Sequence, residues 1–153
     1  MTEVSLKAQL DNDIKAALLG GDRFRGDVLR NLKAAILNEE VAKGKREEGL
    51  DDASVEQLIA REVKKRLDSV QQYTAAARPE LAETEQAEAN ILNEYLPEQL
   101  SEDEIKTVVE AVIAETGAAG PQAMGQVFGA VKGKLGNTAD GATVARLVKE
   151  ALN

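Results

Sequence analysis

The stretch Tyr95-Leu96-Pro97-Glu98-Gln99-Leu100-Ser101 divides this chain of 153 residues into two parts. Proline lacks a backbone N–H and clashes with the preceding turn, so Pro97 cannot continue a helix. Ser101 and Glu104 have the spacing of a capping box, which starts a helix. We therefore predict a bend of the chain at Pro97, with separate helical segments on either side.

Composition and periodicity favour an all-α fold. Ala and Leu dominate the apolar residues and aromatic residues make up only 3%, whereas β-sheets prefer β-branched and aromatic residues. No segment sustains the two-residue alternation of a half-buried strand. The apolar spacing predicts an N-terminal helical domain, residues 1–97, and a small three-helix C-terminal domain, residues 98–153.

Within the N-terminal domain, the second and third helices are predicted to form a long antiparallel hairpin. Only a short polar loop, residues 44–52, connects them, and helices joined by a short loop usually lie antiparallel. The third helix is predicted over Ser54–Arg78 and a fourth over Leu81–Leu96. The spacing of one helical stripe predicts a core face of the second helix made of Phe24, Val28, Leu29, Leu32, Ile36 and Leu37.

The chain contains no histidine and no cysteine, which excludes several kinds of chemistry. Ser-His and Cys-His nucleophile pairs, disulfides, and zinc or haem sites built on these residues cannot form. Glu83, Glu85, Glu88 and Glu94 lack the Glu-x-x-His pattern of di-iron bundles, so we expect them at the surface. We predict no catalytic residues, no cofactor and no metal site.

Charge and hydropathy restrict the partners and the location. A net charge of −8 excludes nucleic-acid binding by bulk electrostatics, so any such binding requires a local basic patch. No apolar run approaches the roughly 20 residues that span a membrane. Residues Met1–Ser5 also lack the basic and apolar regions of a secretory signal. These features predict a cytoplasmic protein with no membrane partner.

Three glycines form a stripe in the predicted sixth helix. Gly125, Gly129 and Gly133 are spaced by four residues, so the stripe drifts by only about 40° per step. It lies roughly 100–180° from Met124, on whose side the apolar residues gather. Each glycine costs about 1 kcal/mol of helix stability relative to alanine. We infer that another backbone approaches the stripe, either a sugar-phosphate chain or a closely packed helix of the same domain.

Four basic residues accompany this stripe. Lys132 lies beside it and Lys134 on the opposite flank. Arg146 and Lys149, three residues apart on the final helix, share a face that extends the patch. If RNA binds, we predict that these four side chains contact phosphates while the glycines let the RNA backbone come close.

Ordered blocks of sequence carry a resemblance that covers nearly the whole chain. They are Asp27–Ile36, Lys65–Ser69, Ala77–Ala82, Glu85, Glu88, Tyr95–Ser101, Met124–Val127 and Ala139–Gly141. At these blocks the chain resembles the GatB/YqeY family, in particular its stand-alone YqeY-like members. The resemblance implies a domain similar to the tail of the GatB subunit of tRNA-dependent amidotransferases, which recognises tRNA. It also implies a role in translation, with a tRNA synthetase or an amidotransferase subunit as a further partner.

The resemblance does not bring catalytic parts with it. The family's enzyme label, carbon–nitrogen ligase with glutamine as amido donor, describes the relatives' whole enzyme. This chain contains neither a Ser-Ser-Lys amidase arrangement nor a nucleotide-binding motif. It also has Asn137-Thr138 where family members often carry a basic residue before the Ala-Asp pair, which removes one expected phosphate contact.

Two hypotheses about function remain open. The first is a non-catalytic tRNA-binding accessory module that contacts RNA through its C-terminal domain. The alternative is a helical protein–protein adaptor that uses the long hairpin and does not bind RNA. The glycine stripe and Lys132 favour RNA, whereas the acidic net charge and Thr138 favour the adaptor.

Overall fold

The computed structural model describes residues 5–153. Met1–Val4 lie outside the described residues, and the expectation that the chain has no secretory signal falls largely on them. Within residues 5–153 the chain forms seven α-helices and two short 3-10 helices, with no strand, so the predicted all-α class is confirmed. No helix in this range is long and apolar enough to cross a membrane. The chain folds as two compact units, Met1–Leu96 and Pro97–Asn153.

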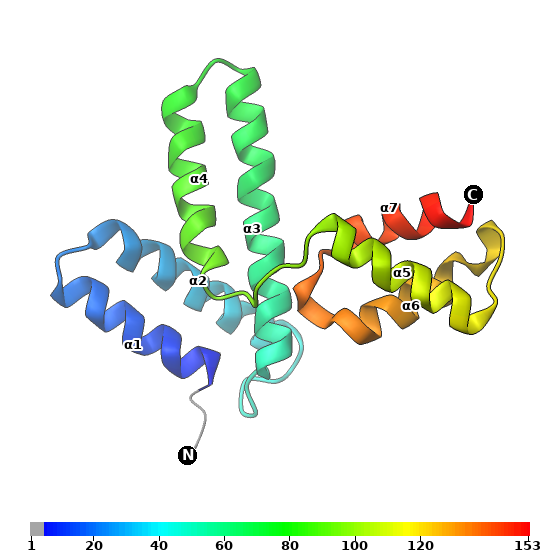
Figure 1. Cartoon of the computed structure of the whole chain (residues 1–153). Helices are drawn as coiled ribbons and strands as arrows, with labels where there is room; N and C mark the ends of the chain where they lie inside the picture. The colour runs from blue at the N-terminus through cyan, green and yellow to red at the C-terminus, as the bar shows by residue number, and fades with distance from the viewer. Residues whose placement is uncertain (1–4) are drawn as a thin grey trace. The chain divides into compact units, whose positions relative to one another are not determined.

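Four helices make up the N-terminal unit (Figure 1). They are α1 (Leu6–Leu19), α2 (Arg23–Ala42), α3 (Asp52–Ala75) and α4 (Pro79–Asn93). The side chains of Ser5, Asp22 and Asp51 accept hydrogen bonds from backbone N–H groups three residues later, as N-cap residues do. Helix α4 has no such cap and begins with Pro79, since proline suits the first position of a helix.

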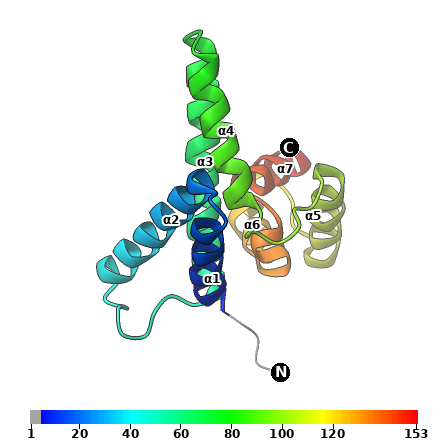
Figure 2. The ribbon, with the colours of Figure 1, turned by 90° about the vertical axis from the view of Figure 1, so that its left-hand side faces the viewer.

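The long hairpin consists of α3 and α4, so the predicted pairing of the second and third helices was wrong. Both views show α3 and α4 side by side, joined by a tight turn (Figures 1 and 2). The turn is only Ala76–Arg78, and Ala77 adopts a positive φ of 59° within it. The α2–α3 loop, residues 43–51, is longer. A longer loop lets consecutive helices separate, whereas the tight turn returns α4 directly along α3.

Helix α4 ends before Pro97. Its last residue is Asn93, three short of the predicted end at Leu96. Leu96 directly precedes Pro97, and a residue before proline is disfavoured in the helical region. The N–H groups of Glu94, Tyr95 and Leu96 donate to carbonyls three residues earlier, which tightens the chain into a turn. Helix α5 then starts at Glu102, and both hydrogen bonds of the predicted capping box at Ser101 are present.

The core of the N-terminal unit takes one face from each helix, with Leu10, Leu29, Ile59 and Leu92 all buried. Two residues predicted for the core face of α2 are exposed, Phe24 at 43% and Leu37 at 44%. They flank the stripe at positions that no neighbouring helix covers.

The outer part of the α3–α4 hairpin has little core of its own. The buried residues of α3 are all near its start, the last being Ile59. Farther along the helix, Leu67 is 41% exposed. In this part of the hairpin, charged side chains lie between α3 and α4. Arg66 of α3 is 3.3 Å from Glu62 on its own helix and 3.9 Å from Glu88 on α4. Burial raises the pKa of Glu88 above its usual value, while Arg66 opposes that rise.

The C-terminal unit is a three-helix bundle with two short 3-10 turns. Its elements are α5 (Glu102–Thr116), η1 (Pro121–Ala123), α6 (Met124–Leu135), η2 (Gly136–Thr138) and α7 (Gly141–Leu152). The three α-helices pack against each other around fully buried valines, Val109, Val112, Val127, Val131, Val144 and Val148. Gly117 ends α5 in the left-handed region, with a φ of 67°, as glycine commonly does at a helix C-terminus.

Candidate functional site

Helix α6 turns one face to the core and the opposite face outward. Val127 and Val131 are fully buried, and Phe128 and Leu135 pack against the same cluster. The three glycines of the stripe lie on the exposed side of the helix. We call this surface, formed by Gly125, Gly129 and Gly133, the glycine face.

No other group of the unit fills the space over the glycine face. A Cβ atom built on Gly125, Gly129 or Gly133 would meet nothing within 4 Å. None of the three has a positive φ, so the backbone does not require glycine there. Close packing against α5 or α7 therefore does not explain these residues, and neither does local conformation.

Lys132 is used within the C-terminal unit. Its Nζ donates to the carbonyl oxygens of Gly136 and Ala139, both at 2.9 Å. The carbonyls at the end of a helix lack partners within it, and a lysine ammonium there also faces the negative end of the helix dipole. Lys132 thus closes the end of α6 and holds the turn that leads into α7.

Lys134 and Arg146 form surface ion pairs with opposite ends of α5. Lys134 Nζ lies 3.2 Å from Glu115, whereas Arg146 pairs with Glu102 and, at 3.3 Å, with Glu150. Glu102 and Glu115 are separated by about 20 Å along the axis of α5. The structure therefore does not bring these two cations to one point.

Lys149 differs from the other three cations. Its side chain is exposed, and among residues 5–153 no ion pair or side-chain hydrogen bond involves it. It lies in the last turn of α7, one helical turn from Arg146. Of the four predicted cations, Lys149 is the one that a phosphate reaches without displacing a group of this part of the chain.

Contacts that the sequence did not predict connect the Tyr95–Ser101 block with the two residues just before the Ala139–Gly141 block. The N–H of Leu100 donates to the carbonyl of Thr138 at 2.8 Å, and Gln99 Nε2 donates to the carbonyl of Asn137 at 2.9 Å. Thr138 in turn donates its hydroxyl to the carbonyl of Leu135 at 2.6 Å. The segment after Pro97 and the turn before α7 are thus held together, and Thr138 serves this turn where a basic residue was expected.

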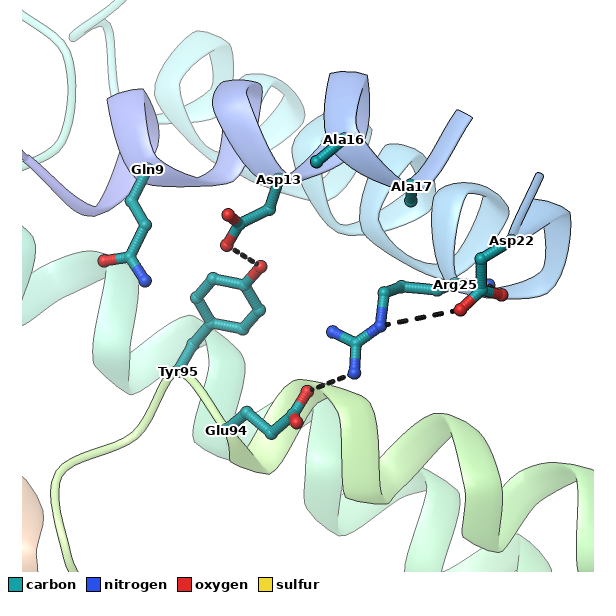
Figure 3. Close-up of a pocket in the computed structure, with 8 residues that line it drawn as sticks. All are labelled: Gln9, Asp13, Ala16, Ala17, Asp22, Arg25, Glu94 and Tyr95. Atoms are coloured by element: carbon teal, nitrogen blue, oxygen red, sulfur yellow. Dashed lines mark hydrogen bonds and ion pairs between the residues drawn. The ribbon is translucent and has the colours of Figure 1, made fainter. Parts of the chain in front are cut away.

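The N-terminal unit contains an open polar pocket of ≈ 440 Å³ between α1, α2 and the end of α4 (Figure 3). Tyr95, 8% exposed, donates its hydroxyl to Asp13 at 2.5 Å. Beside it, Arg25 lies 2.8 Å from Glu94 and 3.9 Å from Asp22. In the sequence, Tyr95 stands out only as part of the motif around Pro97, and no sequence signal indicates its partner on α1.

The polar pocket is built to join helices rather than to carry out acid–base chemistry. Burial and the hydrogen bond to Asp13 raise the pKa of Tyr95 above its usual value, so its hydroxyl remains protonated at neutral pH. Arg25 is occupied by carboxylates from its own helix and from the residue that follows α4. Within residues 5–153 no group of three or more acidic side chains is arranged to hold a metal ion.

Together, residues 5–153 form an all-α protein of two helical units. The chain belongs to the YqeY-like protein family, whose model matches residues 7–152. The predicted family is thereby confirmed.

Several fungal relatives share part of this sequence. Altered inheritance of mitochondria protein 41, mitochondrial, from Lachancea thermotolerans is 31% identical over 117 residues, which are 74% of this chain and 61% of that protein. The protein of the same name from Saccharomyces cerevisiae strain RM11-1a is 32% identical over 88 residues, 57% of this chain and 46% of the relative. The one from Candida glabrata is 27% identical over 125 residues, 80% and 68% of the two chains. The matched part thus spans about half to two thirds of these relatives.

Proposed function

We propose that this protein is a non-catalytic tRNA-binding accessory module, whose C-terminal unit approaches the RNA backbone at the glycine face of α6. The open space over Gly125, Gly129 and Gly133 carries this proposal. Alanine would fit at each position and would stabilise the helix by about 1 kcal/mol. Retaining glycine there is reasonable if an external backbone must come closer than a Cβ atom allows. The resemblance to the tail of the GatB subunit supports tRNA as the ligand.

The phosphate contacts in this proposal come from Lys134, Arg146 and Lys149. Surface ion pairs contribute only about 0–1 kcal/mol, so a phosphate can replace Glu115 beside Lys134 and Glu102 beside Arg146. Lys132 takes a different role, because its ammonium already binds two carbonyl oxygens. It supports the end of the glycine face and need not contact a phosphate.

The test is a titration of the purified full chain against fluorescently labelled total tRNA at several salt concentrations. Three phosphate contacts predict a log–log slope of affinity against salt of about −2 to −3. Lys149→Ala should flatten the slope by just under one unit. The matched control is Lys106→Ala, an exposed lysine on α5, which should leave the slope unchanged. Salt-independent binding, or none at micromolar protein, contradicts the proposal.

A second pair of variants separates RNA contact from folding. Gly129→Leu places a side chain over the glycine face and should weaken tRNA binding without unfolding the unit, because the added Cβ meets nothing within 4 Å. Ala114→Leu adds a similar side chain to an exposed position of α5 and should not affect binding. If both variants bind tRNA like the parent, the glycine face is not the RNA site.

The second candidate is the protein–protein adaptor, and exposed apolar side chains in the N-terminal unit favour it. Leu18, Leu37 and Val41 are 45%, 44% and 55% exposed. A tRNA synthetase or an amidotransferase subunit is the proposed partner in this case. If the tRNA titration shows no binding while such a partner binds, the adaptor replaces the first proposal.

Both proposals assign no catalysis to the isolated protein. We expect neither glutamine hydrolysis nor ATP use, since the sequence offers no histidine or cysteine for a nucleophile–base pair and no phosphate-binding loop motif. Ammonia release from glutamine, abolished by a point substitution in this chain, would contradict this expectation. A cytoplasmic location likewise remains a proposal, because the relatives reported above are named as mitochondrial proteins.

A further inference from the structure

Helices α1 and α2 enclose an open groove that is separate from the polar pocket. It has a volume of ≈ 660 Å³ and is lined by Asp11, Ile14 and Lys15 of α1 and by Arg30, Lys33 and Leu37 of α2. A smaller cavity of ≈ 110 Å³ shares Asp11, Lys33 and Leu37 with it. The two cavities therefore lie next to each other along the helix pair, and we call the larger one the α1–α2 groove.

The floor of this groove is apolar, and the apolar stripe continues beyond it along each helix. Leu37 is 44% exposed, and Val41, one turn farther along α2, is 55% exposed. On α1, Ile14 lines the groove and Leu18, one turn on, is 45% exposed. Isolated exposed leucines are ordinary in proteins, but these side chains follow each other at four-residue spacing on two neighbouring helices. Such a stripe is typical of a surface that receives another helix.

The side chains that line the groove carry a net positive charge, whereas the chain as a whole is negative. Three of its lining residues are cationic and one, Asp11, is acidic, in a chain of net charge −8. Lys33 pairs with Asp11 at 2.6 Å, and Arg30 lies 3.7 Å from Asp27 on its own helix. Within residues 5–153 no ion pair involves Lys15. The rim thus attracts an acidic ligand.

We propose that the α1–α2 groove binds an acidic amphipathic helix of a protein partner. Apolar side chains of that helix, spaced by three and four residues, would cover Ile14 and Leu37, while its Asp or Glu residues would meet Lys15, Arg30 and Lys33. A nucleic acid fits this surface less well, because phosphates would satisfy the cations but leave the apolar floor uncovered. The proposal is independent of tRNA binding, which concerns the other unit, and it gives the adaptor candidate a surface other than the hairpin.

Two synthetic helical peptides test the proposal. Both are roughly 18 residues, about 27 Å of helix, and carry the same leucine stripe, one with glutamates and the other with lysines beside it. Each is labelled and titrated with the full chain by fluorescence anisotropy. The glutamate peptide should bind at least about tenfold more tightly than the lysine peptide, and added salt should reduce the difference. Equal affinities, or no binding of the glutamate peptide, overturn the proposal.

Variants of the protein assign the binding to the groove. Leu37→Glu should weaken binding of the glutamate peptide by at least about tenfold, since it removes an apolar contact and places a negative charge opposite the glutamates of the peptide. The matched control is Leu67→Glu, on α3, because Leu67 and Leu37 are exposed to similar extents, 41% and 44%. Far-UV circular dichroism and the thermal midpoint establish that both variants are folded, and Val41→Glu replaces Leu37→Glu if that variant is not.

The outcomes also distinguish this proposal from tRNA binding. Leu37→Glu should leave tRNA affinity unchanged, whereas Lys149→Ala should leave peptide affinity unchanged. A Leu67→Glu variant that loses peptide binding to the same extent places the peptide elsewhere and overturns the proposal. Self-association of the chain that Leu37→Glu abolishes also overturns it, since the occupant of the groove is then a second copy.

Discussion

Helices α2 and α6 both contain glycine in their interiors, in opposite surroundings. A Cβ atom on Gly26 of α2 would lie 2.9 Å from Leu18 Cδ2, because α1 packs closely there, whereas Cβ atoms on the glycine face of α6 would meet nothing within 4 Å. In α2, the glycine thus lies where another helix of the same unit, α1, packs closely. On α6 no group of the C-terminal unit takes the corresponding place, and our proposal assigns that place to a ligand.

The two units also differ in how deeply their charged side chains are buried. Glu40 of α2 is 3% exposed and accepts hydrogen bonds from Lys7 Nζ at 2.5 Å and from the N–H of Leu50 at 2.9 Å. In the C-terminal unit the pair of Lys134 and Glu115 is exposed. Glu40 connects α1, α2 and the loop before α3. The exposed pair of Lys134 and Glu115 contributes less to the fold, so a ligand could replace Glu115 at small cost.

The largest effect is expected when the buried carboxylate is removed. Glu40→Ala leaves the N–H of Leu50 without its partner and Lys7 without its counterion, so it should reduce the free energy of unfolding by about 3 kcal/mol. Chemical denaturation followed by circular dichroism measures the loss. Glu48→Ala, at an exposed position of the same loop, is the control and should leave the midpoint unchanged. If Glu40→Ala were as stable as the parent, the buried carboxylate of the N-terminal unit would contribute no more to stability than the exposed ion pair of the C-terminal unit.

The same carboxylate should make stability depend on pH. Hydrogen bonds from Lys7 and from Leu50 lower the pKa of Glu40 below its usual value, and the unfolded chain has an ordinary glutamate pKa of about 4.3. The contribution of Glu40 is therefore complete above that value and is lost as the pH falls through the lower pKa of the folded state. The stability difference between the parent and Glu40→Gln should shrink between pH 6 and pH 3. A constant difference over that range would contradict the role of the ionised form.

A matched pair of substitutions tests the two kinds of glycine directly. Gly26→Leu inserts a side chain against Leu18, and overpacking of about 1–3 kcal/mol should exceed the gain in helix propensity of about 1 kcal/mol. Gly129→Leu should show only the gain. The two variants should thus differ by about 1–3 kcal/mol in the free energy of unfolding, with Gly26→Leu the less stable of the two. Destabilisation by Gly129→Leu equal to that by Gly26→Leu would show that the glycine face is a packing surface.

The smallest effect on stability is expected at the exposed ion pair. Lys134→Ala should change the free energy of unfolding by less than about 0.5 kcal/mol, because exposed pairs contribute little. The same substitution should reduce the salt dependence of tRNA binding. A variant that loses stability while its salt dependence is unchanged would show that Lys134 serves the fold and not a ligand.

Local signals predicted much of the secondary structure. The capping box at Ser101 is present as expected, and Pro79 and Pro97 delimit helix α4 within a few residues. Such signals act through hydrogen bonds and steric contacts within one turn, so they can be read without knowing the fold. The core face of α2 was only partly predicted, because the exposure of Phe24 and Leu37 depends on which neighbours cover the flanks.

The sequence by itself determined the all-α class, the ends of several helices and the spacing of the glycines on α6. Only the tertiary structure decided that α3 pairs with α4 and that the glycine face lies open. It also decided the partners of the charged groups, since Arg146 and Glu102 are 44 residues apart in sequence and Tyr95 and Asp13 are 82 apart. Helical periodicity and capping arise from interactions within a few residues. Contacts across such separations depend instead on how loops and packed faces place whole helices, which a local pattern does not encode.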